Sequence, residues 1–266
     1  MKVSTRETSL THALLVIAAV IAVYPLASII VSSLTGDGGG VDWSNFQTAW
    51  TRGSFGQALV ASTVVAVTVV LVTVVVACSA GFALGILRVP AGGAIMAVLL
   101  VGLVLPYEVT VLPLYELLEG WGLIDTYWAL ILPQIGLSVP LGVFWMRTFF
   151  RSVPGELLEA ARIDGATTFQ SLRLILLPIA GPAVATLSTI LFLFTWNEFL
   201  LALILVPQDQ AVQTAPLALS FFAGTDRASD PNVTAAAAVL VALPVVLAYV
   251  LLQRRLITGL TTGAVK

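Results

Sequence analysis

Residues 155–178 read GELLEAARIDGATTFQSLRLILLP and form a short charged stretch in a chain that is otherwise almost entirely apolar. Long apolar runs precede and follow it. Its ionisable residues are Glu156, Glu159, Arg162, Asp164 and Arg173. The side of a membrane on which this stretch lies, and the partner it meets there, therefore decide which fold and function the sequence supports.

The composition is that of a membrane protein. Of the 266 residues, 59% are hydrophobic and 10% are charged, and the mean hydropathy is +1.03. A soluble domain carries about 25% charged residues, so much of this chain has lipid as its solvent. The net charge of −2 argues against a nucleic-acid partner. With Cys78 and His12 as its single cysteine and histidine, the chain can form no intrachain disulfide and offers no thiolate cluster, His-pair metal site or Ser-His-Asp triad.

Six apolar runs are long enough to cross a bilayer, which takes about 20 residues each. The predicted spans are 13–34, 58–87, 93–118, 126–150, 181–206 and 234–252. We therefore expect an all-α membrane protein in which residues 1–266 form a single transmembrane domain. Prolines within these spans indicate kinked helices, either around a pathway or as ordinary bends without a moving part.

The distribution of Lys and Arg sets the predicted orientation, because cytoplasmic loops carry the excess. With the N-terminus in the cytoplasm, ten basic residues lie inside and two lie outside, namely Arg52 and Arg227. The ten are Lys2, Arg6, Arg88, Arg147, Arg151, Arg162, Arg173, Arg254, Arg255 and Lys266. Both termini and the charged stretch are then cytoplasmic, and the outer loops are 35–57, 119–125 and 207–233.

The charged stretch is predicted to be two short helices joined by a sharp turn. The first covers about 155–164 and ends at Gly165, where a left-handed residue is commonly needed. The second opens with Thr167 and Gln170, which are spaced as a capping box, and is expected to break at Pro178. The apolar residues expected on one face of the first helix are Leu157, Leu158, Ala161 and Ile163.

An amphipathic segment of this kind supports two interpretations. Small residues beside a few charges suit docking into a groove of a partner protein. The same pattern also suits an interfacial helix that lies on the membrane surface. The physical chemistry of the segment alone leaves both open.

Several polar residues fall inside the predicted spans, where ionisable groups are costly and are functional candidates by default. Glu108 and Glu198 are expected about 22–26 Å along outward-running helices, in the outer half of the membrane. Glu116 lies nearer the surface and is expected to be structural, and Gln134 adds a further polar group. The candidate pathway-lining residues are Glu108, Trp196, Asn197 and Glu198. The alternative is that these carboxylates are protonated or bonded to other helices.

The charged stretch resembles the EAA loop of ABC-importer permeases. Every fixed position is present: Glu159-Ala160-Ala161, then Gly165 after three residues, Ile175 after nine more, and Leu177-Pro178 after one more. Residues 105–134, 196–203 and 253–266 are similar to stretches of the carbohydrate permeases, and most of all to the smaller subunit of the maltose and glycerol-phosphate type. The resemblance covers nearly the whole chain and is weakest over residues 1–57.

The resemblance implies a type I importer permease of the bacterial inner membrane. In that family a second permease completes the pathway and an extracytoplasmic solute-binding protein delivers the carbohydrate. Two copies of a cytoplasmic P-loop ATPase bind ATP and Mg and drive transport. The segment 155–170 would be the coupling helix, and the residues carrying its ATPase contact would be Glu159, Ala160, Ala161, Asp164 and Gly165. The outer loop 207–233 would face the binding protein, or would instead cap the periplasmic face as a helix.

The chain itself has no P-loop. The motif G-x-x-x-x-G-K-[ST] needs a lysine, and Lys2 and Lys266 are the only two. We therefore expect a transport subunit that is not an enzyme and holds no cofactor. The substrate stays open, sugar phosphates included, although no basic residue is evident in the spans to pair with a phosphate.

Two other classes of protein remain to be weighed. A secondary transporter could use Glu108 and Glu198 as relay carboxylates, but it leaves the charged stretch unexplained and would usually show paired repeats. An intramembrane enzyme fares worse, because the spans show no nucleophile–base pair.

Overall fold

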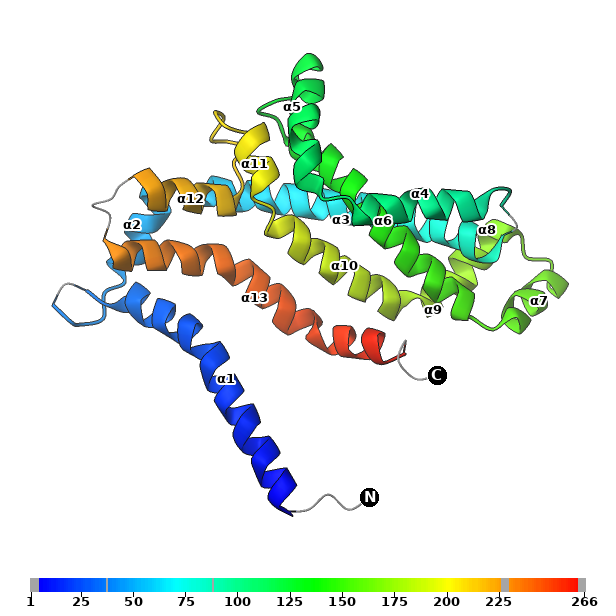
Figure 1. Cartoon of the computed structure of the whole chain (residues 1–266), viewed down its shortest axis with the longest axis horizontal. Coiled ribbons are helices and arrows are strands. Elements are labelled where there is room, and N and C mark those ends of the chain that lie inside the picture. Colours follow the sequence, from blue (N-terminus) through cyan, green and yellow to red (C-terminus); the bar gives the residue numbers. More distant parts are fainter. Residues whose placement is uncertain (1–4, 37, 88, 226–229, 263–266) are drawn as a thin grey trace. The chain divides into compact units, whose positions relative to one another are not determined.

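The computed structural model describes residues 5–36, 38–87, 89–225 and 230–262, which are mostly helical (Figure 1). Four of its helices are long and apolar enough to cross a membrane, and the number reaches six if each of two bent pairs is one span. The long helices are α1 (Thr5–Leu34), α3 (Phe55–Ile86), α6 (Tyr127–Ser152) and α13 (Pro231–Thr262). Among the described residues, β pairing is limited to one isolated bridge, between Thr35 and Val41. The all-α class is therefore confirmed.

Four of the basic residues that set the predicted orientation lie outside the described residues. They are Lys2, Arg88, Arg227 and Lys266.

The remaining elements are shorter. Before α6 lie α2 (Ser44–Arg52), α4 (Gly92–Val104), the 3-10 turn η1 (Tyr107–Thr110) and α5 (Val111–Gly120). Between α6 and α10 (Gly181–Trp196) lie α7 (Gly155–Ile163), α8 (Thr168–Gln170), the π-helical η2 (Ser171–Leu176) and α9 (Leu177–Ile179). After α10 come α11 (Leu200–Leu205) and α12 (Ala215–Thr225).

The chain divides into two compact units, each held together by its own internal contacts. Unit 1 takes residues 1–56 and 218–243, and unit 2 takes residues 57–217 and 244–266. In unit 1, the outer loop predicted over 35–57 contains the helix α2. The buried Asn45 of α2 donates its side-chain amide to the carbonyls of Ser33 and Thr35, at 3.1 Å each. This amide ties α2 to the end of α1.

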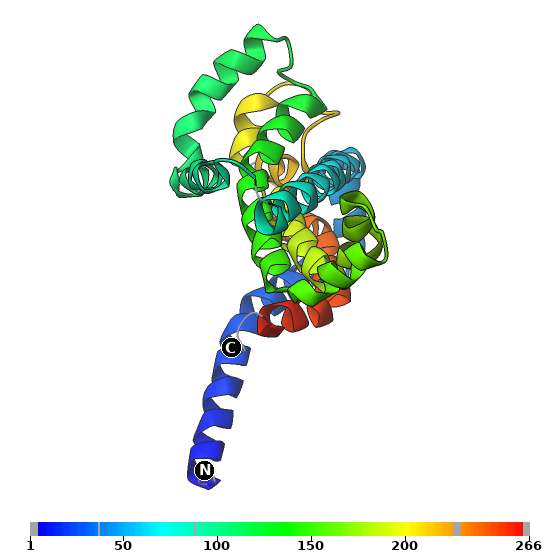
Figure 2. The ribbon, with the colours of Figure 1, turned by 90° about the vertical axis from the view of Figure 1, so that its right-hand side faces the viewer.

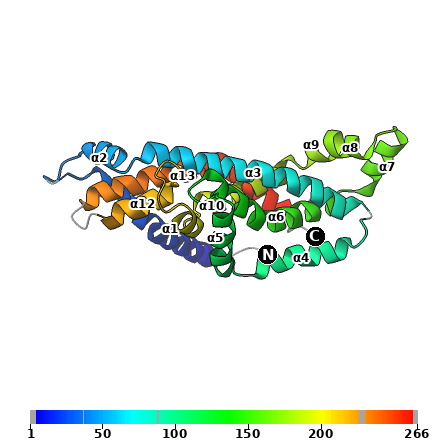
Figure 3. The same cartoon turned by 90° about the horizontal axis from the view of Figure 1, so that it is seen from above.

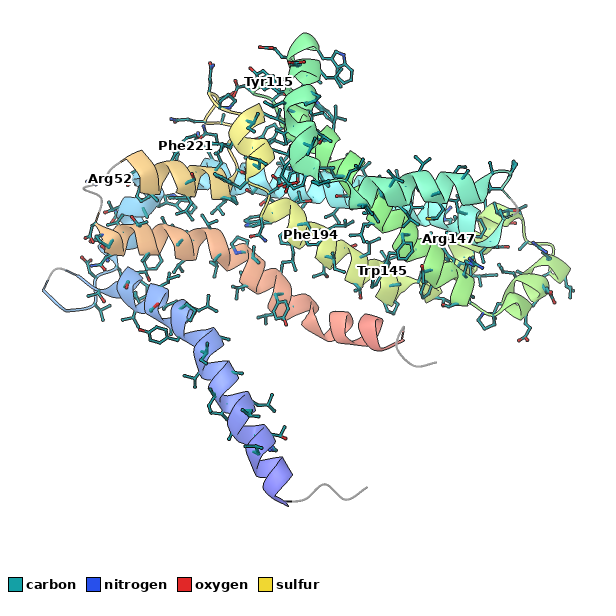
Figure 4. The ribbon with its side chains drawn as sticks, in the orientation of Figure 1. Arg52, Tyr115, Trp145, Arg147, Phe194 and Phe221 are labelled. Atoms are coloured by element: carbon teal, nitrogen blue, oxygen red, sulfur yellow. The ribbon has the colours of Figure 1, made fainter. Side chains whose placement is uncertain are left out.

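In unit 2, α6 contacts α4, α10 and α11. Trp145 of α6 donates its indole N–H to the carbonyl of Ala183 in α10, at 3.1 Å. Arg147 of α6 donates its Nε–H to the carbonyl of Leu84 in α3, also at 3.1 Å (Figure 4). Leu84 is in the last turn of α3, where backbone carbonyls lack helical partners, so Arg147 satisfies one of them.

Glycines let α3 and α6 approach closely. A Cβ atom built at Gly81 of α3 would lie 2.8 Å from both the backbone nitrogen of Arg147 and the Cβ of Met146. One built at Gly142 of α6 would lie 2.9 Å from the Cβ of Ala77. Because lipid gives no hydrophobic driving force between helices, such backbone contacts are a main source of packing energy in membranes.

The third predicted span is broken, contrary to the expected continuous helix over 93–118. α4 ends at Val104, and the pair formed with η1 and α5 is bent by 92°. Figure 2 shows α5 turned away from α4. Leu105 is extended (φ −68°, ψ 128°) because the residue before a proline is biased away from the helical region, and Pro106 follows it. Glu108 therefore lies in the 3-10 turn after the bend, and the rise calculated along a straight helix does not apply to it.

The fifth span is interrupted as well. The apolar run predicts one helix over 181–206, but α10 ends at Trp196 and α11 starts at Leu200. The helical run that precedes this span was predicted to break at Pro178, and it ends one residue later, at Ile179. A 75° bend separates it from α10, which starts at Gly181.

The glycine contact between α3 and α6 predicts a stability difference between two alanine variants. Gly81→Ala should lower the unfolding free energy by about 1–3 kcal/mol, because its methyl group overpacks against the α6 backbone. Gly136→Ala on α6 is the matched control, since no atom lies within 4 Å of its new Cβ and alanine favours the helix. The measurement is thermal unfolding in detergent, followed by size-exclusion chromatography. Equal melting temperatures for the two variants would contradict this packing.

Candidate functional site

The charged stretch begins with a helix whose end is fixed by local backbone bonds. Gly165 has φ +78°, which confirms the predicted left-handed residue. Its N–H donates to the carbonyl of Arg162 at 3.1 Å, and the N–H of Ala166 donates to that of Ala161 at 2.9 Å. These two bonds form a Schellman motif, which satisfies carbonyls at the end of α7.

The start of the second helix is equally defined. The N–H of Gln170 donates to Oγ1 of Thr167 at 3.3 Å, and the N–H of Thr167 donates to Oε1 of Gln170 at 2.8 Å. The predicted capping box is therefore confirmed. Figure 3 shows α7 and α8 projecting together from one end of unit 2. The Schellman motif at the end of α7 and the capping box at the start of α8 therefore both fix the turn between the two helices.

The predicted apolar face of α7 is only partly right. Ala161 is 4% exposed and Leu158 is half-buried, whereas Ile163 is 85% exposed. At 100° per residue, Ile163 lies about 200° around the helix from Ala161, so the two cannot share a face. Of the predicted ATPase-contact residues, Glu159, Ala160, Asp164 and Gly165 are exposed and Ala161 is buried.

A cavity of about 550 Å³ lies in unit 2, beside the break between α10 and α11. Leu103 of α4 and Tyr107 of η1 line one part of it. The residues of α6 that line it are Gln134, Leu137, Ser138 and Leu141. The rest of the lining is Leu191, Leu193, Phe194, Thr195, Asn197 and Glu198. A mostly apolar wall with a few polar groups is typical of a small-molecule site.

The candidate pathway residues divide into two groups. Asn197 and Glu198 line the cavity. Trp196 does not, because it is 2% exposed and its ring packs against Phe192 with centroids 5.4 Å apart. Glu108 is exposed in η1 and is not among the lining residues either. Glu116 is exposed on α5, also away from the cavity.

Side chains at the break satisfy the interrupted backbone. Asn197 donates its Nδ2–H to the carbonyl of Leu193 at 2.7 Å. Oε1 of Glu198 accepts the N–H of Leu201 at 2.9 Å. The Tyr107 side chain interacts with the same carboxylate. The break is therefore a defined structure with polar groups at the cavity wall.

Four polar lining residues were not among the predicted site residues, namely Tyr107, Gln134, Ser138 and Thr195. A signal for two of them was present in the sequence. Leu137, Ser138 and Leu141 lie three, four and seven residues after Gln134, which places all four on one face of a helix. A polar pair one turn apart in an apolar span indicates a surface that faces something other than lipid.

Two predicted outer loops are joined by Asp125. Its Oδ1 accepts the N–H groups of Gln208 at 2.9 Å and Asp209 at 3.0 Å, and its own N–H donates to the carbonyl of Leu205. Asp125 has φ +59°, a left-handed conformation that Asp and Asn tolerate better than other residues with side chains. In the part of the chain that the structure describes, no group of three His, Cys, Asp or Glu residues could hold a metal ion.

Asp125 should control how well the second loop is ordered. Asp125→Gly removes the carboxylate without straining the backbone, and hydrogen exchange at the amides of Gln208 and Asp209 should accelerate by about tenfold, the equivalent of one charge-assisted hydrogen bond. Asp125→Asn keeps an acceptor oxygen and should change exchange much less. Unchanged exchange in the glycine variant, measured by mass spectrometry, would show that other contacts hold the loop.

Comparison with known proteins identifies the family. Residues 77–261 match the model of the binding-protein-dependent transport system inner membrane component. The chain is 34% identical to the trehalose transport system permease protein SugB of Mycobacterium tuberculosis, covering 85% of this chain and 82% of that protein. It is 39% identical to the sn-glycerol-3-phosphate transport system permease protein UgpE of Rhizobium meliloti, over 67% of this chain and 63% of that one.

The fold matches a solved structure as well. A crystal structure of a bacterial ABC transporter involved in the import of the acidic polysaccharide alginate contains a chain that superposes with a TM-score of 0.78. The match covers 96% of this chain and 99% of that one, at 21% identity. The chain therefore belongs to the family of binding-protein-dependent transport system inner membrane components and is a permease subunit of an ABC importer.

Proposed function

We propose that this chain carries a carbohydrate across the bacterial cytoplasmic membrane as one of two permeases in an ATP-driven importer. Two copies of a separate P-loop ATPase, which bind ATP and Mg, would drive it, and an extracytoplasmic solute-binding protein would deliver the solute. Trehalose is the solute named for the permease SugB, and melibiose, raffinose and stachyose are named for a Bacillus subtilis relative at 32% identity. These names support a carbohydrate as the class of solute.

The observation that carries the proposal is the α7–Gly165–α8 element. Its helix ends are fixed by a Schellman motif and a capping box, yet its surface is largely uncovered. Ile163 is 85% exposed and Phe169 is 66% exposed. Exposed apolar side chains on an ordered element outside the predicted spans suit a protein partner, and we assign the ATPase to that role.

The orientation follows from the same assignment. The ATPase is cytoplasmic, so α7 and α8 would lie inside, in agreement with the distribution of Lys and Arg. Both chain termini would also be cytoplasmic. The loops joined by Asp125 would then lie outside, where the binding protein docks.

We place the solute pathway at the α10–α11 break. Asn197 and Glu198 would line it from this subunit, together with the polar residues of α6 and η1. Glu108 lies one residue from the cavity-lining Tyr107 and would meet solute only nearer the outer mouth of the pathway. Trp196 would support the break from behind through its contact with Phe192.

Purification of the complex tests this function. A tagged chain expressed in its native cell should retain a second permease and a P-loop ATPase in mild detergent. Gly165→Asp should reduce the recovered ATPase by at least about tenfold, which corresponds to about 1.4 kcal/mol of binding free energy. The physical reason is that a side chain both strains a left-handed backbone and projects from the docking surface.

Gly122→Asp is the matched control for this experiment. Gly122 has φ +67°, and an added Cβ would have no atom within 4 Å, as at Gly165, but it lies in the predicted outer loop. It should therefore introduce similar strain and retain the ATPase. Equal loss of ATPase in both variants would indicate a folding defect, and recovery of the chain without any ATPase would refute the importer assembly.

A further inference from the structure

The cavity presents hydrogen-bonding groups that the chain itself leaves unused. Gln134 is 5% exposed, lines the cavity and makes no side-chain hydrogen bond to another described residue. The amide is not among the side-chain groups that are fully buried without a partner, so it reaches the cavity and offers two donors and an acceptor there. Ser138 lines the cavity one helical turn further along α6, also without such a bond.

The spacing and surroundings of this pair suit a polyhydroxylated solute. Residues four apart on a helix have Cβ atoms about 5–6 Å apart, so Gln134 and Ser138 can reach two hydroxyl groups of one small molecule. Leu137, Leu141 and Phe194 supply the apolar wall on which the C–H face of such a molecule can pack. Thr195 and Asn197 add polar groups on the α10 side.

The residues that line the cavity carry a negative charge and no positive charge. Glu198 is the only carboxylate among the lining residues, and they include no Lys, Arg or His. The nearest basic residue along α6 is Arg147, nine residues beyond Ser138 and thus about 14 Å away along the helix axis. Its Nε–H is already donated to Leu84. An anion in this cavity would meet a carboxylate and no compensating cation.

We infer that this cavity selects an uncharged polyhydroxylated solute, with Gln134 and Ser138 binding its hydroxyl groups and Glu198 rejecting anions. The inference rests on the proposed function, because it assumes that the cavity lies on the solute pathway. It also narrows the proposed function, because it excludes anionic solutes. One of the relatives is named for such a solute, sn-glycerol 3-phosphate.

Cysteine chemistry in the assembled importer tests the charge selection. Ser138→Cys is combined with Cys78→Ala, which removes the buried native thiol, and the complex is reconstituted in lipid nanodiscs during ATP turnover. Two methanethiosulfonate reagents are compared, one carrying a trimethylammonium group and the other a sulfonate. Each rate is divided by that reagent's rate with a small free thiol. The cation should react at least about tenfold faster than the anion after this correction.

Two variants separate the contribution of Glu198 from other sources of charge. Glu198→Gln keeps an oxygen for the Leu201 N–H and should bring the ratio of rates close to one. Glu116→Gln, at an exposed acid away from the cavity, should leave the ratio unchanged. Equal rates in the parent, an unchanged ratio in Glu198→Gln, or no reaction of the introduced cysteine with either reagent would overturn the inference.

Protection of the same cysteine tests hydroxyl binding without requiring the natural solute. Trehalose should slow modification by up to about twofold at a concentration that half-occupies the site, and an equal concentration of glycerol 3-phosphate should not. Gln134→Leu should abolish the protection by trehalose. Equal protection by both probes, or protection by neither, would overturn the selection of an uncharged polyol.

The importer function is measured separately in the same preparation, as stimulation of ATP hydrolysis by the binding protein. Retained stimulation with equal reagent rates would overturn the charge selection alone. Loss of stimulation with the tenfold ratio intact would overturn the proposed importer instead.

Discussion

The fold of this permease depends on the requirement that every backbone N–H and C=O inside a bilayer finds a partner within the protein. Continuous helices such as α3 and α6 meet it through their own hydrogen bonds. The break between α10 and α11 meets it with side chains, because Asn197 donates to the carbonyl of Leu193 and Glu198 accepts the N–H of Leu201. These two polar side chains at the cavity wall thus satisfy backbone groups that the break leaves without helical partners.

Apolar side chains pack the other end of α10 against its neighbours, and Leu187 and Leu191 of α10 belong to one buried cluster. Leu172 and Leu176 of η2 are buried in the same cluster with Met146 and Phe150 of α6 and Phe82 of α3. The chain therefore leaves the α7–Gly165–α8 element, which we propose as the docking element, and enters the core within a few residues. A displacement of α8 would reach α10 through these packed side chains, because a close-packed interior transmits strain. The cavity lies at the far end of α10, so one helix joins both candidate sites.

What could be predicted from the sequence is what depends on local chemistry. The apolar runs, the left-handed Gly165 and the Thr167–Gln170 capping box need only near neighbours, and the structure has the turn and the box as expected. The bend at Pro106 could not be predicted in the same way, because a proline within a span is compatible with both a kink and a complete break.

The residues that line the cavity could be predicted only in part, because the lining depends on tertiary contacts. Asn197 and Glu198 stand out as polar residues within a span, but Ser138 and Tyr107 line the cavity only because α6, η1 and α10 converge there. The chemistry of Trp196 favours the pathway, and only its packing on Phe192 removes it from the wall.

Glu198 has a cost that its structural role does not explain. It lies at the break between α10 and α11 beside a mostly apolar cavity wall, where a charged carboxylate costs more free energy than a neutral polar group. Capping the N–H of Leu201 needs only an oxygen acceptor, which a glutamine side chain supplies without a charge. The backbone of the break therefore accounts for a polar residue at position 198 but not for a carboxylate. The negative charge is the part that the fold does not require, and a role in deciding which solutes enter the cavity accounts for it.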